Sequence, residues 1–230
     1  MKLSIIIPCF NESRTINSLI NNVKNIKIPN IKKEIIVVDD GSFDETNNLL
    51  KNIRNINLIV HSKNYGKGKA IKTGLKFSTG SIILIQDADL EYDPNDILLL
   101  IEKKMKKNIK VVYGSRILRK NSYSSLSFYL GGILLTKIVN ILFPKAKLTD
   151  MHTCYKMFDR DVLESIKLDS NGFEFCPEIT AKILKQNLKI YEVPISYHKQ
   201  GLDYEVCKHF KLDLLKKPNL TRWNKINEIL

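Results

Sequence analysis

Three polar clusters in the first half of the chain have residue types that can do chemistry. They are Pro8-Cys9-Phe10-Asn11-Glu12, Asp39-Asp40-Gly41-Ser42 and Asp87-Ala88-Asp89-Leu90-Glu91, and each follows a short apolar run. If those runs are parallel strands of one sheet, their carboxyl ends meet at one edge and bring the clusters together in a crevice. The spacing therefore predicts a single site assembled from three separate segments.

The third cluster is the strongest candidate for a metal site. Asp87 and Asp89 alternate along a segment expected to be extended, and Glu91 lies two residues further on. Clustered carboxylates repel one another unless a hard cation neutralises them. Oxygen ligands of this kind suit Mg²⁺ or Mn²⁺, above all when a diphosphate completes the coordination shell. We predict that Asp87, Asp89 and Glu91 hold such an ion; the alternative is a helix N-terminus, where acidic residues are also favoured.

Two further segments are candidates for contacts with a nucleotide. Asp39 could accept hydrogen bonds from a base or a ribose, although its cluster also fits a turn followed by a helix cap. The loop from Asn64 to Lys69, a basic turn that includes Lys67, could approach a phosphate. Neither a P-loop nor a GxGxxG fingerprint is present, so ordinary ATPase and dinucleotide-binding functions are not indicated.

The composition indicates which binding partners and which cellular location to expect. With 37 Lys and Arg against 24 Asp and Glu in 230 residues, the formal net charge is +13, which favours phosphorylated substrates or an acidic membrane surface. Nucleic acid is not an expected partner, because no recognition motif is found. The four cysteines form no CxxC pair, so neither a zinc site nor a disulfide framework is predicted. Without a cleavable signal or an uncharged apolar run of membrane-spanning length, a cytoplasmic location is expected.

Alternating strand and helix patterns would position these clusters. Apolar, β-branched runs predict strands at Leu3–Ile7, Glu34–Val38, Asn57–Val60, Ser81–Ile85, Val111–Gly114 and Lys189–Val193. Helical spacing predicts a helix capped by Ser13, another around Ala70, a third opened by Pro94 and a fourth over Glu178–Lys185. The pattern indicates an α/β fold: one domain over residues 1–230, with a Rossmann-like, mostly parallel sheet covered by helices on both faces.

An apolar stretch at residues 126–143 suggests a possible membrane contact. Its broad apolar face is formed by Leu126, Leu130, Ile133, Leu134, Ile138, Ile141 and Leu142. Such a helix beside a basic surface could lie in a membrane interface and bring a lipid phosphate to the crevice. The alternative is a helix packed on its own core or on a second copy of the chain.

Taken in order, the motifs resemble those of the family 2 inverting glycosyltransferases, and within that family the dolichyl-phosphate mannose or glucose synthase branch. The resemblance is carried by Ser4-Ile-Ile-Ile-Pro-Cys-Phe-Asn-Glu12, Ile36-Val-Val-Asp-Asp-Gly-Ser42, Asn64-Tyr-Gly-Lys-Gly68 and Gln86-Asp-Ala-Asp-Leu-Glu91. It continues through Tyr113-Gly-Ser-Arg116, Leu148-Thr-Asp-Met-His-Thr-Cys-Tyr-Lys156, Phe173-Glu-Phe-Cys-Pro-Glu-Ile-Thr-Ala-Lys182 and Glu192-Val-Pro-Ile-Ser-Tyr197. The matching motifs run over roughly residues 3 to 200.

The resemblance implies a GT-A fold whose residues 1–115 bind the nucleotide-sugar and whose residues 116–230 face the acceptor. The implied nucleotide-sugar contacts are Pro8, Phe10, Asn11, Glu12, Val37, Asp39, Asp40, Lys67, Asp87, Ala88 and Asp89. The implied catalytic residues are Asp89, Arg116, Asp150 and Lys156, with Arg116 and Lys156 facing the phosphates. After Tyr197 the chain departs from the branch, because its segment from His198 to Lys208 lacks the usual Arg and Glu-Gly-Lys-Lys stretch.

The implied reaction moves a hexose from a nucleotide-sugar of the GDP-mannose or UDP-glucose type to an acceptor, with inversion. A polyprenyl phosphate of the dolichyl type is the favoured acceptor, and it needs no base because a phosphate monoester is largely ionised at neutral pH. A sugar hydroxyl would need one, and Asp150 is the candidate; its alternative role is to orient Lys156. A family 2 transferase acting on a glycan hydroxyl and a non-catalytic nucleotide-sugar-binding protein remain alternatives. Contact with an anionic membrane would make the protein peripheral on its cytoplasmic face.

Overall fold

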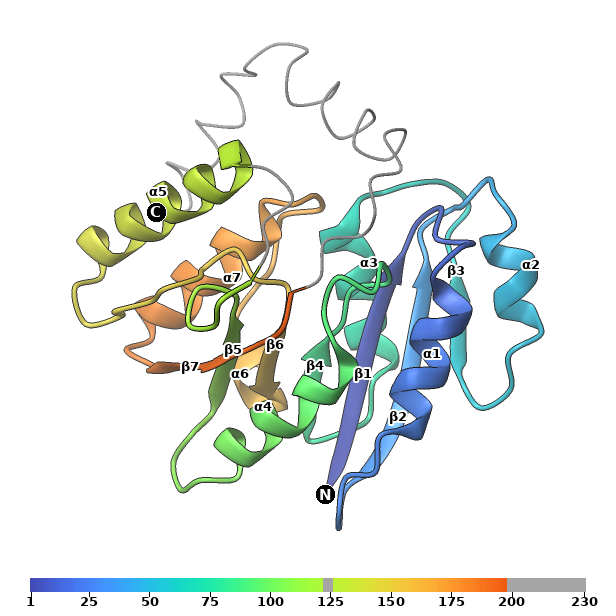
Figure 1. Ribbon diagram of the computed structural model, residues 1–230, viewed down its shortest axis with the longest axis horizontal. Helices are drawn as coiled ribbons and strands as arrows, with labels where there is room; N and C mark the ends of the chain where they lie inside the picture. Colours follow the sequence, from blue (N-terminus) through green and yellow to red (C-terminus); the bar gives the residue numbers. More distant parts are fainter. Residues whose placement is uncertain (122–125, 198–230) are drawn as a thin grey trace.

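A seven-stranded sheet forms the centre of the part of the chain that the structure, a computed structural model, describes: residues 1–121 and 126–197 (Figure 1). The strands are β1 (Lys2–Cys9), β2 (Lys32–Asp39), β3 (Asn57–Val60), β4 (Ile82–Ile85), β5 (Val111–Ser115), β6 (Lys156–Asp159) and β7 (Ile190–Pro194). Their order across the sheet is β3-β2-β1-β4-β6-β5-β7. All neighbouring pairs are parallel except the two that β6 forms with β4 and β5.

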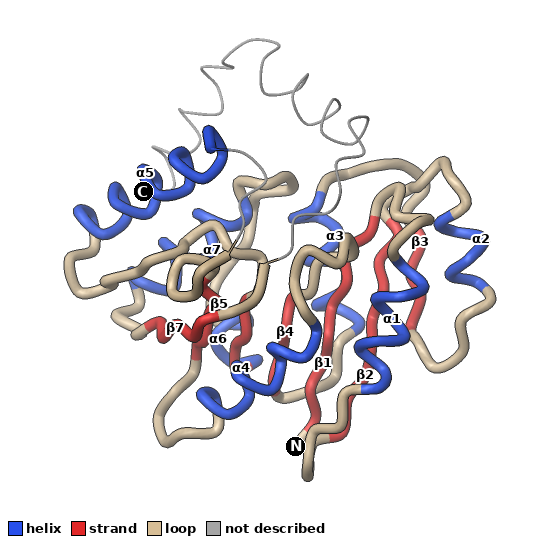
Figure 2. Tube along the Cα trace, in the orientation of Figure 1, coloured by secondary structure: helices blue, strands red, loops and turns tan. Residues whose placement is uncertain are grey.

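Helices cover both faces of this sheet, as Figure 2 shows. They are α1 (Ile16–Asn25), α2 (Thr46–Lys51), α3 (Lys67–Phe77), the short 3₁₀ helix η1 (Pro94–Asp96), α4 (Ile97–Lys104), α5 (Leu126–Leu142), α6 (Arg160–Glu164) and α7 (Phe175–Lys185). Within the described ranges, no helix is both long and apolar enough to span a membrane.

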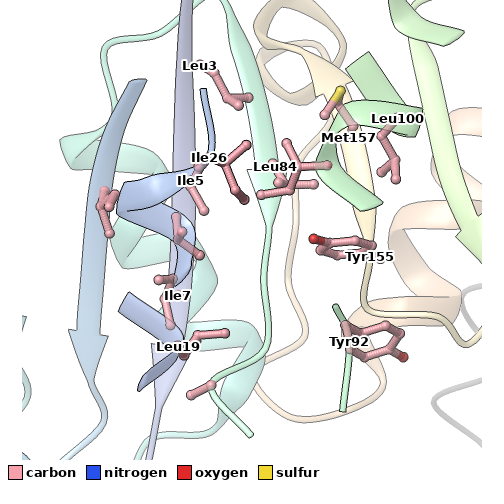
Figure 3. Packing of buried hydrophobic residues seen from close by; sticks show 14 of the residues in the cluster. Leu3, Ile5, Ile7, Leu19, Ile26, Leu84, Tyr92, Leu100, Tyr155 and Met157 are labelled. Carbon is pink, nitrogen blue, oxygen red and sulfur yellow. The ribbon is translucent and has the colours of Figure 1, made fainter. Parts of the chain in front are cut away.

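The alternation of side chains along β1 builds two separate cores. Leu3, Ile5 and Ile7 belong to a core that includes residues of α1 and α4 on one face; Figure 3 shows Leu19 near Ile7 and Leu100 near Met157 of β6. Alternate strand residues on the other face pack with α3, α5, α6 and α7. Because each fully buried aliphatic side chain contributes roughly 1.5–3 kcal/mol, both faces of the sheet stabilise the fold. The predicted α/β class, a mostly parallel sheet between two helical layers, is confirmed.

Several local predictions differ from the structure. Ser13 does not cap the first helix: α1 begins at Ile16, and the Ser13 amide donates to Asp44 Oδ2 at 3.2 Å. The segment after β4 is bent rather than extended, because Leu90 adopts a positive φ of 61°. Strand β6 was not among the predicted strands. It is antiparallel and inserts between β4 and β5, so β5 pairs with strands from the later part of the chain.

Candidate active site

The candidate site lies at the edge of the sheet where the parallel strands end, above β1, β2 and β4 in Figure 1. The loops after β1, β2, β4 and β5 meet there. Lys156 belongs to the same edge because β6 runs the other way and begins where its neighbours end; it pairs with Ile85 and Tyr113. The sheet therefore brings together segments from residue 8 to residue 156.

Hydrogen bonds tie the loop after β1 to the loop after β2. Asn11, at a φ of 55°, donates its amide to Ser42 Oγ at 2.9 Å and accepts from the Phe43 amide at 3.0 Å. The Glu12 amide donates to Thr46 Oγ1 at 2.8 Å, and burial raises the pKa of the Glu12 carboxyl. Phe10, which is 38% exposed, packs edge to face with Phe43. These contacts fix a rim whose aromatic rings are open to a ligand.

Asp39 and Val37 lie behind that rim and have no exposed surface. The Asp39 carboxylate accepts bonds from the Ser42 amide at 3.0 Å and from Asn47 Nδ2 at 2.8 Å, while Val37 packs in the core beside α1. The buried Pro8 lies in β1 opposite Val38. In this conformation Asp39 holds the loop after β2 in place, and Val37 and Pro8 are buried within the sheet.

Asp40 organises the next loop, which carries Lys67. Its carboxylate accepts the amide of Tyr65 at 3.0 Å and that of Gly66 at 2.7 Å, and it contacts His61 Nδ1 at 2.6 Å. Every one of these partners belongs to the protein, and Asp40 is only 3% exposed. Asp40 thus positions the loop, whereas the sequence had suggested a direct nucleotide contact.

Lys67 lies against the acidic segment. Its ammonium forms an ion pair with Asp87 and lies 2.5 Å from the buried Oδ1. Lys67 also donates to Cys154 Sγ at 3.0 Å. The ion pair raises the pKa of Lys67 against the opposing effect of burial, so the lysine stays charged. The carboxylate of Asp87 is therefore charge-compensated by the protein itself.

Asp89 and Glu91 face a different environment. Burial, followed by repulsion from Asp87 and Glu91, raises the pKa of Asp89 well above its usual value. Burial also raises the pKa of Glu91, although Tyr197 Oη donates to Glu91 Oε2 at 2.8 Å. Ala88, between the two aspartates, is buried. The segment carries more negative charge than its immediate partners compensate.

The residues fit a divalent ion in chemistry but do not form a finished cage. Among the described residues, no three His, Cys, Asp or Glu side chains are arranged to hold a metal ion. The predicted trio of Asp87, Asp89 and Glu91 is not preformed, because Asp87 is paired with Lys67 and Glu91 with Tyr197. Mg²⁺ commonly binds through one or two carboxylates plus substrate phosphates. Asp89, and Asp87 once Lys67 releases its oxygen, suit that arrangement.

A second, largely buried ion pair lies at the same edge of the sheet. Arg116 donates to Asp150 through Nε at 2.7 Å and through Nη2 at 2.9 Å, and its guanidinium lies 5.4 Å from the centre of the Tyr197 ring. Although burial opposes ionisation, Arg116 lowers the pKa of Asp150. Glu192 accepts the amides of Thr149 and Asp150 at 2.8 and 2.9 Å. Asp150 therefore orients Arg116, and the role suggested for it toward Lys156 is not seen.

Lys156 is enclosed. It has no exposed surface, and its ammonium donates to the Met151 carbonyl at 2.8 Å and lies 3.6 Å from the centre of the Tyr113 ring. Burial lowers its pKa to about 8. Lys156 thus braces the segment before β6 and does not face an open phosphate site in this conformation. Burial likewise lowers the pKa of His152 to about 4, and His152 Nε2 has no hydrogen-bond partner among the described residues.

Sequence reasoning assigned no role to three residues that the structure places in the site. Tyr197 links Glu91 and Arg116, Cys154 accepts from Lys67, and Tyr92 pairs with Tyr197 and stacks on Tyr155. Tyr197 and Cys154 stood within the matching motifs, which was the available signal; their partners lie 62 or more residues away and could not be read from spacing. The departing segment at residues 198–208 lies outside the described residues.

Comparison with known proteins decides the family. The model of the family described as Glycosyl transferase family 2 matches residues 4–167, which include all three acidic and polar clusters. The chain belongs to glycosyl transferase family 2. It is a glycosyltransferase whose carboxyl-edge loops occupy the matched region.

Two curated relatives illustrate the similarity of this glycosyltransferase to named enzymes. It is 31% identical to the UDP-N-acetylglucosamine–dolichyl-phosphate N-acetylglucosaminyltransferase of Methanococcus voltae, over 83% of each chain. It is 29% identical to the dolichol-phosphate mannosyltransferase of Pyrococcus furiosus, over 86% of this chain. The match spans 56% of the length of the Pyrococcus protein.

A solved structure agrees on the fold of this glycosyltransferase. The glucosyl-3-phosphoglycerate synthase of Mycobacterium tuberculosis, in complex with Mn²⁺, UDP and glucosyl-3-phosphoglycerate, superposes with a TM-score of 0.70. The two chains are 19% identical, and the match covers 88% of this chain and 74% of the mycobacterial one. The shared architecture is the GT-A fold that the motifs predicted.

Proposed function

We propose that the chain transfers a hexose from a nucleoside-diphosphate sugar to a polyprenyl phosphate, with inversion at the anomeric carbon. An oxygen of the acceptor phosphate would form the new bond to that carbon while the bond to the diphosphate breaks. Support comes from the family, from the dolichyl-phosphate enzymes of Methanococcus and Pyrococcus to which the chain is similar, and from a basic protein suited to anionic substrates.

The observation that carries the proposal is the acidic segment after β4, whose negative charge is only partly compensated by Lys67, together with the guanidinium of Arg116. Asp87 and Asp89 would hold Mg²⁺ or Mn²⁺, which would supply positive charge to the diphosphate as it leaves. Arg116, held by both oxygens of Asp150, presents a fixed positive charge on the other side. Phe10 and Phe43 offer aromatic surface at the nucleoside end.

A phosphate acceptor also explains why Asp150 is tied to Arg116. Both of its oxygens accept guanidinium hydrogen bonds, and its pKa is lowered, which makes it a poor proton acceptor. A phosphate monoester, with a second pKa of about 6, attacks as an anion and requires no base. Asp150 is accordingly proposed to position Arg116 instead of removing a proton.

The location we propose is peripheral, on the cytoplasmic face of an anionic membrane. On α5, Leu134 is 57% exposed, Ile141 75% and Leu142 49%, although Val139 of the same helix is buried in the core. The exposed Lys137 lies on the same helix. An apolar strip beside basic groups suits a membrane interface, where a polyprenyl phosphate resides.

The test is a transfer assay with UDP- and GDP-sugars, Mn²⁺ and either polyprenyl phosphate or free saccharides. Product on the lipid phosphate, lost on adding a chelator and reduced at least about 100-fold in Asp89→Ala, is expected. Asp161→Ala removes an exposed carboxylate at the opposite edge of the sheet and should retain activity. Transfer to saccharide hydroxyls alone would overturn the acceptor assignment, and turnover unaffected by chelator would overturn the metal assignment.

A further inference from the structure

The ion pair between Lys67 and Asp87 joins two loops that both serve the candidate site. Their side chains are only 18% and 10% exposed, and the separation of Nζ and Oδ1 is 2.5 Å. Cys154 Sγ accepts from the same ammonium at 3.0 Å, and the ring of Phe173 lies 5.7 Å from it. The ammonium is thus surrounded by protein groups on several sides.

The backbone that presents Lys67 is held on two sides. The Gly66 amide donates to Asp40 Oδ2, and a Cβ at Gly66 would lie 2.5 Å from the Asn171 carbonyl oxygen, so the loop packs directly on that segment. The Lys69 amide donates to the same Asn171 oxygen at 3.0 Å. Gly66 has a φ of 100°, which a side chain would disfavour. A backbone fixed this tightly directs the lysine toward Asp87.

A metal ion and this ammonium would compete for the same carboxylate. A metal–oxygen bond is about 2.1 Å long, so an ion on Asp87 Oδ1 would lie within about 5 Å of a lysine that kept its present place. Two cations at that distance in a poorly hydrated site repel each other strongly. Divalent binding at Asp87 therefore requires the ammonium to withdraw.

We propose that Lys67 is a built-in counterion of the metal site, which neutralises Asp87 until a divalent ion takes its place. The identity of that ion rests on the proposed function. Once displaced, the ammonium remains beside the site and can bind the diphosphate that the ion carries. Lys67 consequently weakens metal binding to the free protein and strengthens it when a nucleoside diphosphate is present.

The test measures Mn²⁺ binding by the electron paramagnetic resonance of free Mn²⁺, without nucleotide and with UDP or GDP. In Lys67→Met, Mn²⁺ alone should bind about 5- to 150-fold more tightly than in the unmodified protein, the range typical of coupling between two ligands. With the nucleoside diphosphate, this advantage should shrink or reverse. Lys63→Met removes an equal charge from the exposed part of the same loop and should leave both affinities unchanged.

Equal or weaker Mn²⁺ binding by Lys67→Met without nucleotide would overturn the counterion role. Folding is checked separately by thermal unfolding without metal: Lys67→Met should unfold at a lower temperature, and the double variant Lys67→Met/Asp87→Asn should recover part of the loss. Additive losses would also contradict the pairing. If the unmodified protein shows no Mn²⁺ binding that Asp89→Ala abolishes, the proposed metal site itself fails, an outcome distinct from a normal site that Lys67 does not influence.

Discussion

Three carboxylates at the carboxyl edge of the sheet each have a specific partner. Asp40 takes two backbone amides and a histidine, Asp150 takes a guanidinium, and Asp87 takes an ammonium. The Lys67–Asp87 and Arg116–Asp150 pairs join opposite formal charges, and none of these four side chains is more than 25% exposed. Removing either ion pair should therefore lower the stability of the protein as well as its activity.

Asp150→Asn should destabilise the protein by about 3 kcal/mol, because the guanidinium of Arg116 would lose its counter-charge in a site that is only 25% exposed. Urea unfolding measures this change. The control is Asp161→Asn, whose partner Lys110 is 47% exposed and whose loss should change stability far less, because exposed ion pairs contribute little. Equal effects of the two substitutions would contradict the importance given to burial.

The contacts of Glu34 lead us to expect that the folded protein becomes less stable in acid. Burial favours its neutral form, but hydrogen bonds from Lys2, Ser4 and Thr79 prevail and lower its pKa from 4.5 to about 2. The native state then binds fewer protons than the unfolded chain between these values, so the stabilisation is complete above pH 4.5 and lost as the pH falls toward 2. It amounts to at most about 3 kcal/mol.

Unfolding of the unmodified protein and of Glu34→Gln, measured from pH 7 to pH 2.5, checks this expectation. The substitution should flatten the pH dependence across this window, whereas Glu102→Gln on the exposed face of α4 should not. A variant curve parallel to that of the unmodified protein would argue against the assignment.

Two glycines show how element packing decides the effect of one methyl group. A Cβ at Gly66 would meet the Asn171 carbonyl oxygen at 2.5 Å, while one at Gly131 in α5 would meet nothing within 4 Å. Gly66→Ala should destabilise by about 1–3 kcal/mol, because a positive φ and a backbone contact both oppose the side chain. Gly131→Ala should stabilise by roughly 0.5–1 kcal/mol through its helix propensity. Thermal unfolding of both variants tests the contrast in sign.

The exposed apolar side chains of helix α5 lead us to expect that this helix contacts lipid. Replacing the exposed Ile141 by Asp should reduce co-sedimentation with anionic liposomes at low salt at least about threefold, because it places a negative charge in the apolar strip. Phe77→Asp, at a similarly exposed apolar residue on α3, is the matched control. Equal losses in both variants would indicate a general effect of charge instead of a membrane-facing helix.

At the level of elements, the strands that carry the site were readable from the sequence and the connecting details were not. Uniform β-branched runs predicted β1 to β4 to within a few residues. Strand β6 was not predicted because only two apolar residues, Met157 and Phe158, lie between its charged ends. It forms a strand because it pairs with its neighbours β4 and β5. The helix α2 is six residues long and rich in asparagine, too short for a periodic signal.

Across the whole molecule, the position of the site could be predicted but its electrostatic connections could not. Parallel strands dictate that the clusters gather at one edge. Which cation reaches which carboxylate depends on contacts across the fold, such as Lys67 with Asp87 and Arg116 with Asp150, and no local pattern encodes them. That is why Asp150 was linked to Lys156 from sequence, while the structure links it to Arg116.

The interior strand β1 should be among the most stable parts of the molecule. Ile5, Ile6 and Ile7 are fully buried, and β1 is bonded to β2 on one side and β4 on the other. Their amide hydrogens should exchange only through global unfolding, whereas those of the edge strand β3 should exchange through smaller openings. Hydrogen exchange monitored by mass spectrometry or NMR tests this order, and faster exchange in β1 than in β3 would contradict it.

The insertion of β6 between β4 and β5 has a consequence for biosynthesis. A nascent chain that has emerged from the ribosome only as far as β5 has no partner to offer the free edge of β4, because residues 156–159 are made later. Until they arrive, apolar strand edges are exposed to other chains, a hazard for aggregation. Truncated chains ending near residue 115 should accordingly depend on chaperones, and full-length chains should escape that dependence once Lys156 to Asp159 have been translated.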